Sequence, residues 1–296
     1  MIKSALKFVF TAIFSLILIV IAVPLIIGAI AGAAMTVSEV SHQGKSHIAV
    51  LELTEAIMDS KDFIEALNEQ LEKPSVKGIV VRIDSPGGAV GPSQEIYSAI
   101  KKGKEIKPIV ASMGAVAASG GLYSALGATK ILAQPGTLTG SIGVIIQMPY
   151  LKKIADFVGV DLVTLKSGQF KDVGNPLREM SEAEKALIQK SIDTVHGQFM
   201  AAVSESRGIE MAKVKEFADG RVIVGSDAKE LGLIDDFGGV NEAARLALEL
   251  SKDEETKGTT PYTTYPMDRY KSFKDVLRGV SYIRRMSQGG IQLLYR

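Results

Sequence analysis

Two short segments of the sequence combine the residue types that nucleophilic catalysis needs. Residues 114–121 (GAVAASGG) place Ser119 among alanine and glycine, which leaves its hydroxyl uncrowded and the neighbouring amides open to a ligand. Residues 167–174 (SGQFKDVG) hold Lys171 between two glycines. Because a serine nucleophile needs a base to take its proton, we expect Lys171 to be the base for Ser119.

Histidine, the usual partner of a catalytic serine, is scarce in this chain. The three histidines are His42, His47 at the first predicted strand, and His196 within a long predicted helix. None lies in a loop with turn residues around it, and Ser119 lacks the G-x-S-x-G pattern of a nucleophile elbow. A histidine triad stays open because triads are spatial and not sequential, but the pattern favours a lysine base.

A lysine acts as a general base only when it is neutral, so its pKa must be lowered by burial away from other charges. Phe170 suits such a setting, whereas the adjacent Asp172 opposes it if its carboxylate points inward. A hydroxyl from Thr139 or Ser141 can accept a hydrogen bond from the amine and orient it. The competing interpretation is that Lys171 is a solvated surface residue.

Acyl transfer also needs donors that face a developing negative oxygen. The turn at residues 84–88 (DSPGG) follows a predicted strand, and its glycines allow backbone angles that point amides outward. A helix that begins at Ser119 would present the Gly120 amide at its positive end. The two segments form one pocket if their strands are neighbours; otherwise residues 84–88 are a plain turn before a helix.

Composition narrows the function classes. The chain has 296 residues, a formal net charge of +1 and no cysteine. Absence of cysteine excludes disulfides, thiol nucleophiles and cysteine-based zinc sites. The balanced charge gives no reason to expect nucleic acid as a partner, and no ligand spacing such as H-E-x-x-H predicts a metal. We therefore expect no metal and no cofactor.

A membrane anchor is predicted at the N-terminus. No charged residue lies between Lys7 and Glu39, and residues 8–30 are almost wholly apolar, which is long enough to span a bilayer. Basic residues precede this run, so the positive-inside rule predicts a single-pass cell-membrane protein with a cytoplasmic N-terminus and the rest of the chain outside the cytoplasm. A cleaved signal peptide is the alternative, but its apolar region is usually shorter.

The remaining sequence alternates strand and helix patterns. This order predicts an α/β domain of βαβ units with a mostly parallel sheet. The predicted division is residues 1–37 for the cytoplasmic start and anchor, 38–46 for a stalk, 47–250 for a catalytic domain and 251–296 for a basic tail. Strands are expected over 47–53, 78–83, 108–112, 130–133, 142–147 and 161–165, and helices over 60–71, 92–104, 119–127 and 181–206.

Two of these segments carry further signals. Ser181 and Glu184 have the spacing of a capping box, which predicts the start of the longest helix. In the tail, residues 273–283 place apolar side chains on one helical face beside several lysines and arginines. This face could rest on an anionic membrane or dock on another subunit, although an ordinary amphipathic helix or a loosely ordered tail is the simpler interpretation.

Four ordered motifs resemble one known family. Residues 113–121 (MGAVAASGG), 134–144 (QPGTLTGSIGV) and 166–172 (KSGQFKD), together with the 84–88 turn, are similar to the signature segments of signal peptide peptidase A. The likeness covers roughly residues 47–250 and is closest to the short, single-repeat form of that family. It implies a membrane-bound serine peptidase of the Clp-protease/crotonase-like fold, with repeated ββα and βαβ units.

The resemblance also implies roles for individual residues. Ser119 matches the nucleophile, Lys171 the general base and Ser141 the hydroxyl that orients the lysine. Backbone amides around Gly87 and Gly120 match the oxyanion donors, and Gly88 is the alternative to Gly87. Family members form ring-shaped homo-oligomers in which the lysine of one subunit reaches the serine of its neighbour, so active sites lie near subunit interfaces. Their substrates are remnant signal peptides and other short or unfolded hydrophobic peptides.

Three alternatives to this function stay open. A peptidase of the type that cleaves stomatin-like proteins shares the Ser–Lys chemistry and a similar serine segment. A membrane scaffold without enzymatic activity would use the same loops for subunit packing and pair Lys171 with an acid. A crotonase-like acyl-CoA enzyme shares the fold, but the predicted extracytoplasmic location argues against CoA as its substrate.

Overall fold

The chain divides into two compact units, residues 1–45 and 46–296. The structure, a computed structural model, describes residues 45–253, 256, 258–266, 294 and 295. The predicted anchor and the amphipathic segment of the tail lie outside these residues. Within the described part, no helix combines the length and the apolar character needed to cross a bilayer. The fold below is that of the second unit.

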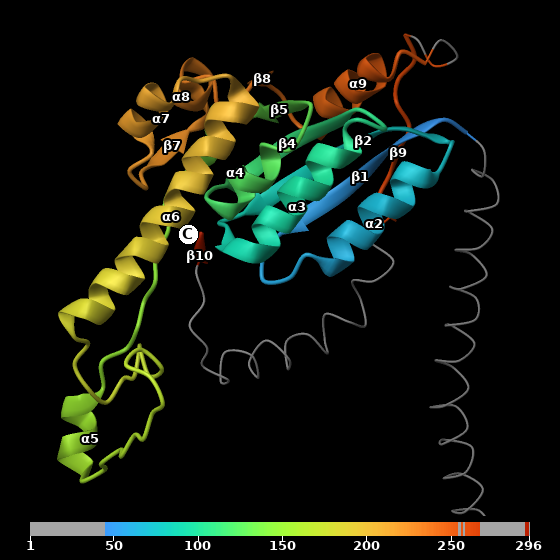
Figure 1. The fold of residues 1–296 in the computed structure, drawn as a ribbon. Helices are drawn as coiled ribbons and strands as arrows, with labels where there is room; N and C mark the ends of the chain where they lie inside the picture. Colours follow the sequence, from blue (N-terminus) through green and yellow to red (C-terminus); the bar gives the residue numbers. More distant parts are fainter. Residues whose placement is uncertain (1–44, 254–255, 257, 267–293, 296) are drawn as a thin grey trace, which may run out of the picture. The chain divides into compact units, whose positions relative to one another are not determined.

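Strands and helices alternate along most of the described chain (Figure 1). In chain order they are β1 (His47–Thr54), α2 (Lys61–Glu72), β2 (Val76–Ser85), β3 (Gly88–Ala89), α3 (Val90–Gly103), β4 (Ile109–Ala117), α4 (Gly120–Ala125), β5 (Lys130–Ala133), β6 (Leu138–Gly140), α5 (Lys152–Val158), α6 (Glu182–Arg207), α7 (Met211–Phe217), β7 (Val222–Val224), α8 (Gly225–Glu230), β8 (Asp236–Phe237), α9 (Val240–Ser251), β9 (Thr263–Thr264) and β10 (Leu294–Tyr295).

A mostly parallel sheet forms the centre of the unit. Strands β9, β1, β2 and β4 are neighbours and run parallel, and β4 continues to β5 and then β8 on its other side. Near its end β4 also pairs with β6, which is antiparallel to β7. The predicted α/β class with a largely parallel sheet is thereby confirmed, whereas the finer likeness to the Clp-protease/crotonase fold stays a prediction.

Both faces of the sheet are covered, which explains why its strands are continuous apolar runs. In β1, Ile48 and Val50 belong to the cluster that packs against α9. The intervening Ala49 and Leu51 belong to the larger cluster on the opposite face, which includes residues of α2, α3, α4 and α6. The alternation follows from the two-residue period of a strand.

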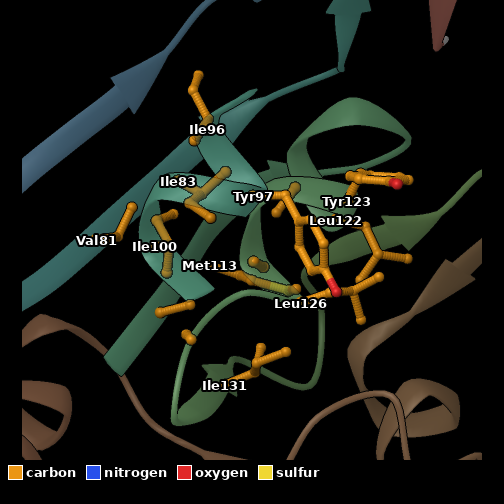
Figure 2. Close-up of a cluster of buried hydrophobic side chains, with 14 of the residues drawn as sticks. Val81, Ile83, Ile96, Tyr97, Ile100, Met113, Leu122, Tyr123, Leu126 and Ile131 are labelled. Carbon is orange, nitrogen blue, oxygen red and sulfur yellow. The ribbon is translucent and has the colours of Figure 1, made fainter. Parts of the chain in front are cut away.

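The larger cluster fixes the helices that surround Ser119. Figure 2 shows Tyr97 of α3 and Tyr123 of α4 among buried aliphatic side chains, and their rings lie 5.1 Å apart, edge to face. Tyr123 also contacts Phe199 of α6, at a centroid separation of 4.9 Å. Helix α4 is buried along its whole length. The later part of α6 is therefore anchored to α4, while its first turns lead away from the sheet (Figure 1).

Two predicted strands are wrong, and both lie in the segment between β6 and α6, residues 141–181. Residues 142–147 form no regular strand, although Ile142 and Val144 are buried; Ile145 alone makes a β-bridge. Residues 161–165 are extended but unpaired, and Val163 and Leu165 are 84% and 93% exposed. The apolar pattern of residues 142–147 thus reflects burial of Ile142 and Val144 in the larger core cluster, whereas that of residues 161–165 lies on the surface.

The long helix, in contrast, begins as predicted. Ser181 precedes α6, its hydroxyl accepts the Glu184 amide, and the Glu184 carboxylate accepts the Ser181 amide at 2.8 Å. These reciprocal bonds satisfy amides that a helix start would otherwise leave unpaired. The predicted capping box is confirmed.

Candidate active site

Ser119 occupies a strained turn between β4 and α4. Its backbone angles are φ 54° and ψ −116°, a conformation that residues with a Cβ rarely adopt. Two backbone hydrogen bonds hold the turn: the Ser119 amide donates to the Gly140 carbonyl at 2.9 Å, and the Tyr123 amide donates to the Ser119 carbonyl at 2.8 Å. The strand–turn–helix geometry of a nucleophile elbow is present although its sequence pattern is not.

The Ser119 hydroxyl is buried and makes no hydrogen bond within the described part of the chain. Buried hydroxyls are normally satisfied, so an unpaired one on a strained turn points to a functional group. Neither His47, whose ring contacts Tyr262, nor His196 in α6 is bonded to it. The described residues hold no cluster of three or more His, Asp and Glu side chains that could bind a metal ion.

The predicted oxyanion segments lie beside the serine. A Cβ placed on Gly120 would stand 3.2 Å from the Gly88 nitrogen and 2.5 Å from Ser93 Oγ, so the two backbones approach as closely as glycine allows. The Gly87 amide donates to Ser85 Oγ at 3.2 Å. The approach of the Gly88 nitrogen makes Gly88 the candidate partner of Gly120.

The two candidate hydroxyls of the next loop, Thr139 and Ser141, flank Gly140. Thr139 Oγ1 donates to the Ala117 carbonyl at 2.7 Å, which ties β6 to β4. Ser141 is buried, has a positive φ of 50°, and follows Gly140, the residue bonded to the Ser119 amide. Ser119, Ser141, Gly88 and Gly120 are therefore gathered at one edge of the sheet.

Within one chain, Lys171 lies apart from these four residues. It is exposed, and its Nζ forms no ion pair or hydrogen bond with a described residue. Its loop, yellow-green in Figure 1, lies beside α5 at the start of α6 and away from α4. Along α6, residues 184 to 199 span roughly 22 Å at 1.5 Å per residue. Because Phe199 is the part of α6 that touches α4, Lys171 is remote from Ser119 of the same chain.

A network of charges surrounds the residue next to Lys171. The Asp172 carboxylate pairs with Lys166 at 2.5 Å and with Arg178 Nε at 2.8 Å. Hydrogen bonds from these two cations hold the pKa of Asp172 well below its usual range. Arg178 also binds Glu184, and together with the Ser181 amide it lowers the pKa of Glu184 to about 2. In the sequence, Asp172 stands out as a carboxylate that could oppose a neutral Lys171. In the structure, this carboxylate pairs with Lys166 and Arg178.

Strand β10 adds a feature that the sequence did not predict. Leu294 and Tyr295 pair antiparallel with Ala89 and Gly88 of β3 (Figure 1). These are the residues next to the Ser119 turn. The only sequence signal was the apolar and aromatic composition of this short segment, which is too weak to specify a partner. The pairing places a short extended segment along the β3 edge.

Comparison with known proteins agrees with this geometry. A family model described as Peptidase family S49 matches residues 101–253, more than half of the chain. The chain belongs to peptidase family S49. The predicted recognition is confirmed at the level of the family, and the coarse assignment as a protease of the kind represented by SppA, protease 4 and SohB follows from it.

Individual relatives support the same assignment. A Synechocystis protein named as a candidate protease is 42% identical over 209 residues, which cover 70% of this chain and 75% of that protein. A candidate signal peptide peptidase SppA of Enterococcus faecium is 37% identical over 60% of this chain and 52% of its own length. The chloroplastic serine protease SPPA of Arabidopsis thaliana is 34% identical over 75% of this chain, and the match spans about a third (32%) of that longer protein.

Proposed function

We propose that the chain is a membrane-anchored serine endopeptidase that works through an acyl-enzyme, with Ser119 as nucleophile and Lys171 as general base. The observation that carries the proposal is the buried Ser119 hydroxyl, which has no hydrogen-bond partner in the described chain and sits on a strained turn. Such a hydroxyl is available to a base that is brought to it, and a neutral lysine amine can act as that base.

In the proposed reaction, Ser119 Oγ attacks the scissile carbonyl while Lys171 Nζ takes its proton. The amides of Gly88 and Gly120 bind the oxyanion, and the amine then returns the proton to the leaving nitrogen. Water repeats the sequence on the acyl-enzyme and releases the second product. Ser141 accepts a hydrogen bond from Lys171 and orients it. The roles of Gly88, Gly120 and Ser141 are supported by their proximity to the Ser119 turn, whereas the role of Lys171 is carried over from the resemblance of residues 166–172 to the family motif.

The base comes from a neighbouring copy. Two facts support this: the Lys171 loop lies at the far end of α6 from α4, and the segment between β6 and α6 that carries it exposes large apolar side chains. Phe157 is 90% and Leu165 is 93% exposed, which is costly for a surface unless another molecule covers it. Head-to-tail packing of such arms onto the next subunit closes a ring, which is the assembly we propose.

The proposed substrates are remnant signal peptides and other short or unfolded hydrophobic peptides. The β3 edge supports binding in an extended conformation, because it already pairs with β10 in an antiparallel sense. An apolar run at residues 8–30 would keep the catalytic unit at the membrane, where such peptides are released. Stomatin-like proteins are the second candidate substrate class, and a non-enzymatic scaffold is the alternative outside the enzyme class.

Subunit complementation tests the proposal. Ser119→Ala and Lys171→Ala should each abolish cleavage of a hydrophobic peptide while leaving fold and assembly intact. Co-expression of the two variants should restore about a quarter of wild-type activity, because one neighbour pair in four then joins an intact serine to an intact lysine. Full activity of Lys171→Ala alone would remove the mechanism. A fluorophosphonate label mapped to Ser119 would argue against the scaffold.

A further inference from the structure

Arg178 connects the base-bearing loop to the start of α6. Its Nε donates to Asp172 Oδ2 at 2.8 Å and its Nη2 to the Asp172 carbonyl at 3.2 Å. Its Nη1 donates to Glu184 Oε2 at 2.9 Å, and Glu184 is itself locked into the capping box of the helix. One guanidinium therefore spans two carboxylates, one next to Lys171 and one on the first turn of α6.

The position of the Asp172 carboxylate matters for the proposed role of Lys171. Asp172 follows Lys171 directly in sequence, and a carboxylate near an ammonium group stabilises the charged form of the amine. Its side chain is instead turned to Lys166 and Arg178 and is 12% exposed. The main chain of the loop is held as well, because Lys166 also donates to the Gln169 carbonyl at 3.0 Å.

We propose that Arg178 is a positioning residue for the base: it keeps the Asp172 carboxylate away from Lys171 and fixes the Lys171 loop to α6. The inference rests on the proposed role of Lys171. Arg178 itself does not touch the substrate, and it acts on Lys171 only through Asp172 and the loop backbone.

Several other charged groups around the loop are paired, whereas the Glu179 carboxylate and Lys153 form no ion pair with a described residue. On α5, Lys152 pairs with Asp156 at 2.6 Å, and on α6, Lys185 pairs with Glu182 at 2.7 Å. Glu184 binds Arg178, and Lys166 binds Asp172. Glu179 provides its carbonyl to Arg178. Loss of the guanidinium removes one of the two cationic partners of Asp172 and leaves Lys166, so the carboxylate is held less firmly away from Lys171. Glu184 loses the same partner, but it lies on α6 and not beside Lys171 in sequence.

The test is a pH profile on three variants of the assembled full chain. Arg178→Gln should move the acidic limb of kcat/KM to higher pH by about one unit, as expected when a carboxylate can approach a lysine. The double variant Asp172→Asn/Arg178→Gln should bring the limb back to the wild-type position, because no carboxylate remains to be released. Asp172→Asn alone should leave the limb in place or move it to lower pH.

Labelling of Lys171 by an amine-reactive reagent, mapped by mass spectrometry across pH, gives a second readout that does not need activity. The same shift and the same rescue are expected there. If neither the acidic limb nor the labelling curve moves in Arg178→Gln, the proposal is wrong. It is also wrong if the shift persists in the double variant, because the effect of Arg178 would then not act through the Asp172 carboxylate. Failure of the proposed function appears separately, as undiminished cleavage by Lys171→Ala.

Discussion

The Ser119 amide donates a hydrogen bond to the Gly140 carbonyl at 2.9 Å. This single bond joins the turn that carries the proposed nucleophile to the loop that carries Ser141. Ser119 and Ser141 both have positive φ, 54° and 50°, so both turns are strained. The hydrogen bond from the Ser119 amide to Gly140 holds the two turns together. The site is thus built from two irregular turns at one sheet edge, and its proposed base is delivered by a third segment.

Gly120→Ala should abolish activity. The added Cβ would stand 2.5 Å from Ser93 Oγ and 3.2 Å from the Gly88 nitrogen, which displaces the two proposed oxyanion donors. Loss of one such donor lowers kcat by about 100- to 1000-fold. Gly136→Ala is the matched control, because nothing lies within 4 Å of a Cβ there. Equal kcat for the two variants would show that Gly120 has no part in the reaction.

Phe199→Ala should destabilise the catalytic unit. The ring is fully buried and packs on Tyr123 of α4, and truncating a buried phenylalanine costs about 3–5 kcal/mol. Chemical denaturation measures the loss. Activity should fall as well, because α4 fixes the Ser119 turn. A loss below about 1 kcal/mol would mean that α6 is not anchored through this ring.

Phe157→Ser and Leu165→Ser should disrupt assembly without loosening the fold. Both side chains are almost fully exposed in the single chain, so their replacement removes no core contact but does remove apolar surface for a neighbour. Sedimentation in detergent should report smaller species, and cleavage should fall because Lys171 no longer reaches another Ser119. Unchanged size and activity would contradict the proposed ring.

Deletion of residues 294–296 should raise the initial rate on short peptides. Strand β10 pairs with Gly88 and Ala89, the edge along which we place the substrate, so the two compete for the same backbone groups. A lower KM with little change in kcat is expected. A synthetic peptide with the deleted sequence should inhibit the shortened enzyme competitively. If KM does not change, β10 does not occupy the substrate position.

Glu184→Gln should change how stability depends on pH. The pKa of Glu184 is lowered to about 2 by Arg178 and Ser181, so in the wild type its ionised form adds stability above the unfolded pKa near 4.3, and this is lost as pH falls towards 2. The variant should have a lower Tm at pH 7 and a flatter decline in acid. Glu182→Gln, on the exposed face of the same turn, is the control. Parallel Tm curves for both variants would contradict the assignment.

Several features could be read from the sequence because they depend on local chemistry. The apolar strands 47–53 and 78–83, the capping box of Ser181 and Glu184, and the four motifs that define the family all reflect the residues that form them. Periodicity and capping act over a few residues, so local sequence is enough to specify them. The same locality explains why residues 142–147 and 161–165 were misassigned, because a local apolar pattern does not specify whether the segment pairs with a neighbouring strand.

The tertiary structure alone decided how these pieces meet. Parallel pairing of β2 with β4 brings the 84–88 turn beside Ser119, and it brings the backbones of Gly87 and Gly88 close to Gly120. The rotation of Asp172 towards Arg178, the distance of Lys171 from its own serine and the pairing of β10 with β3 are likewise long-range. Contacts between distant residues depend on packing and charge that no local pattern encodes.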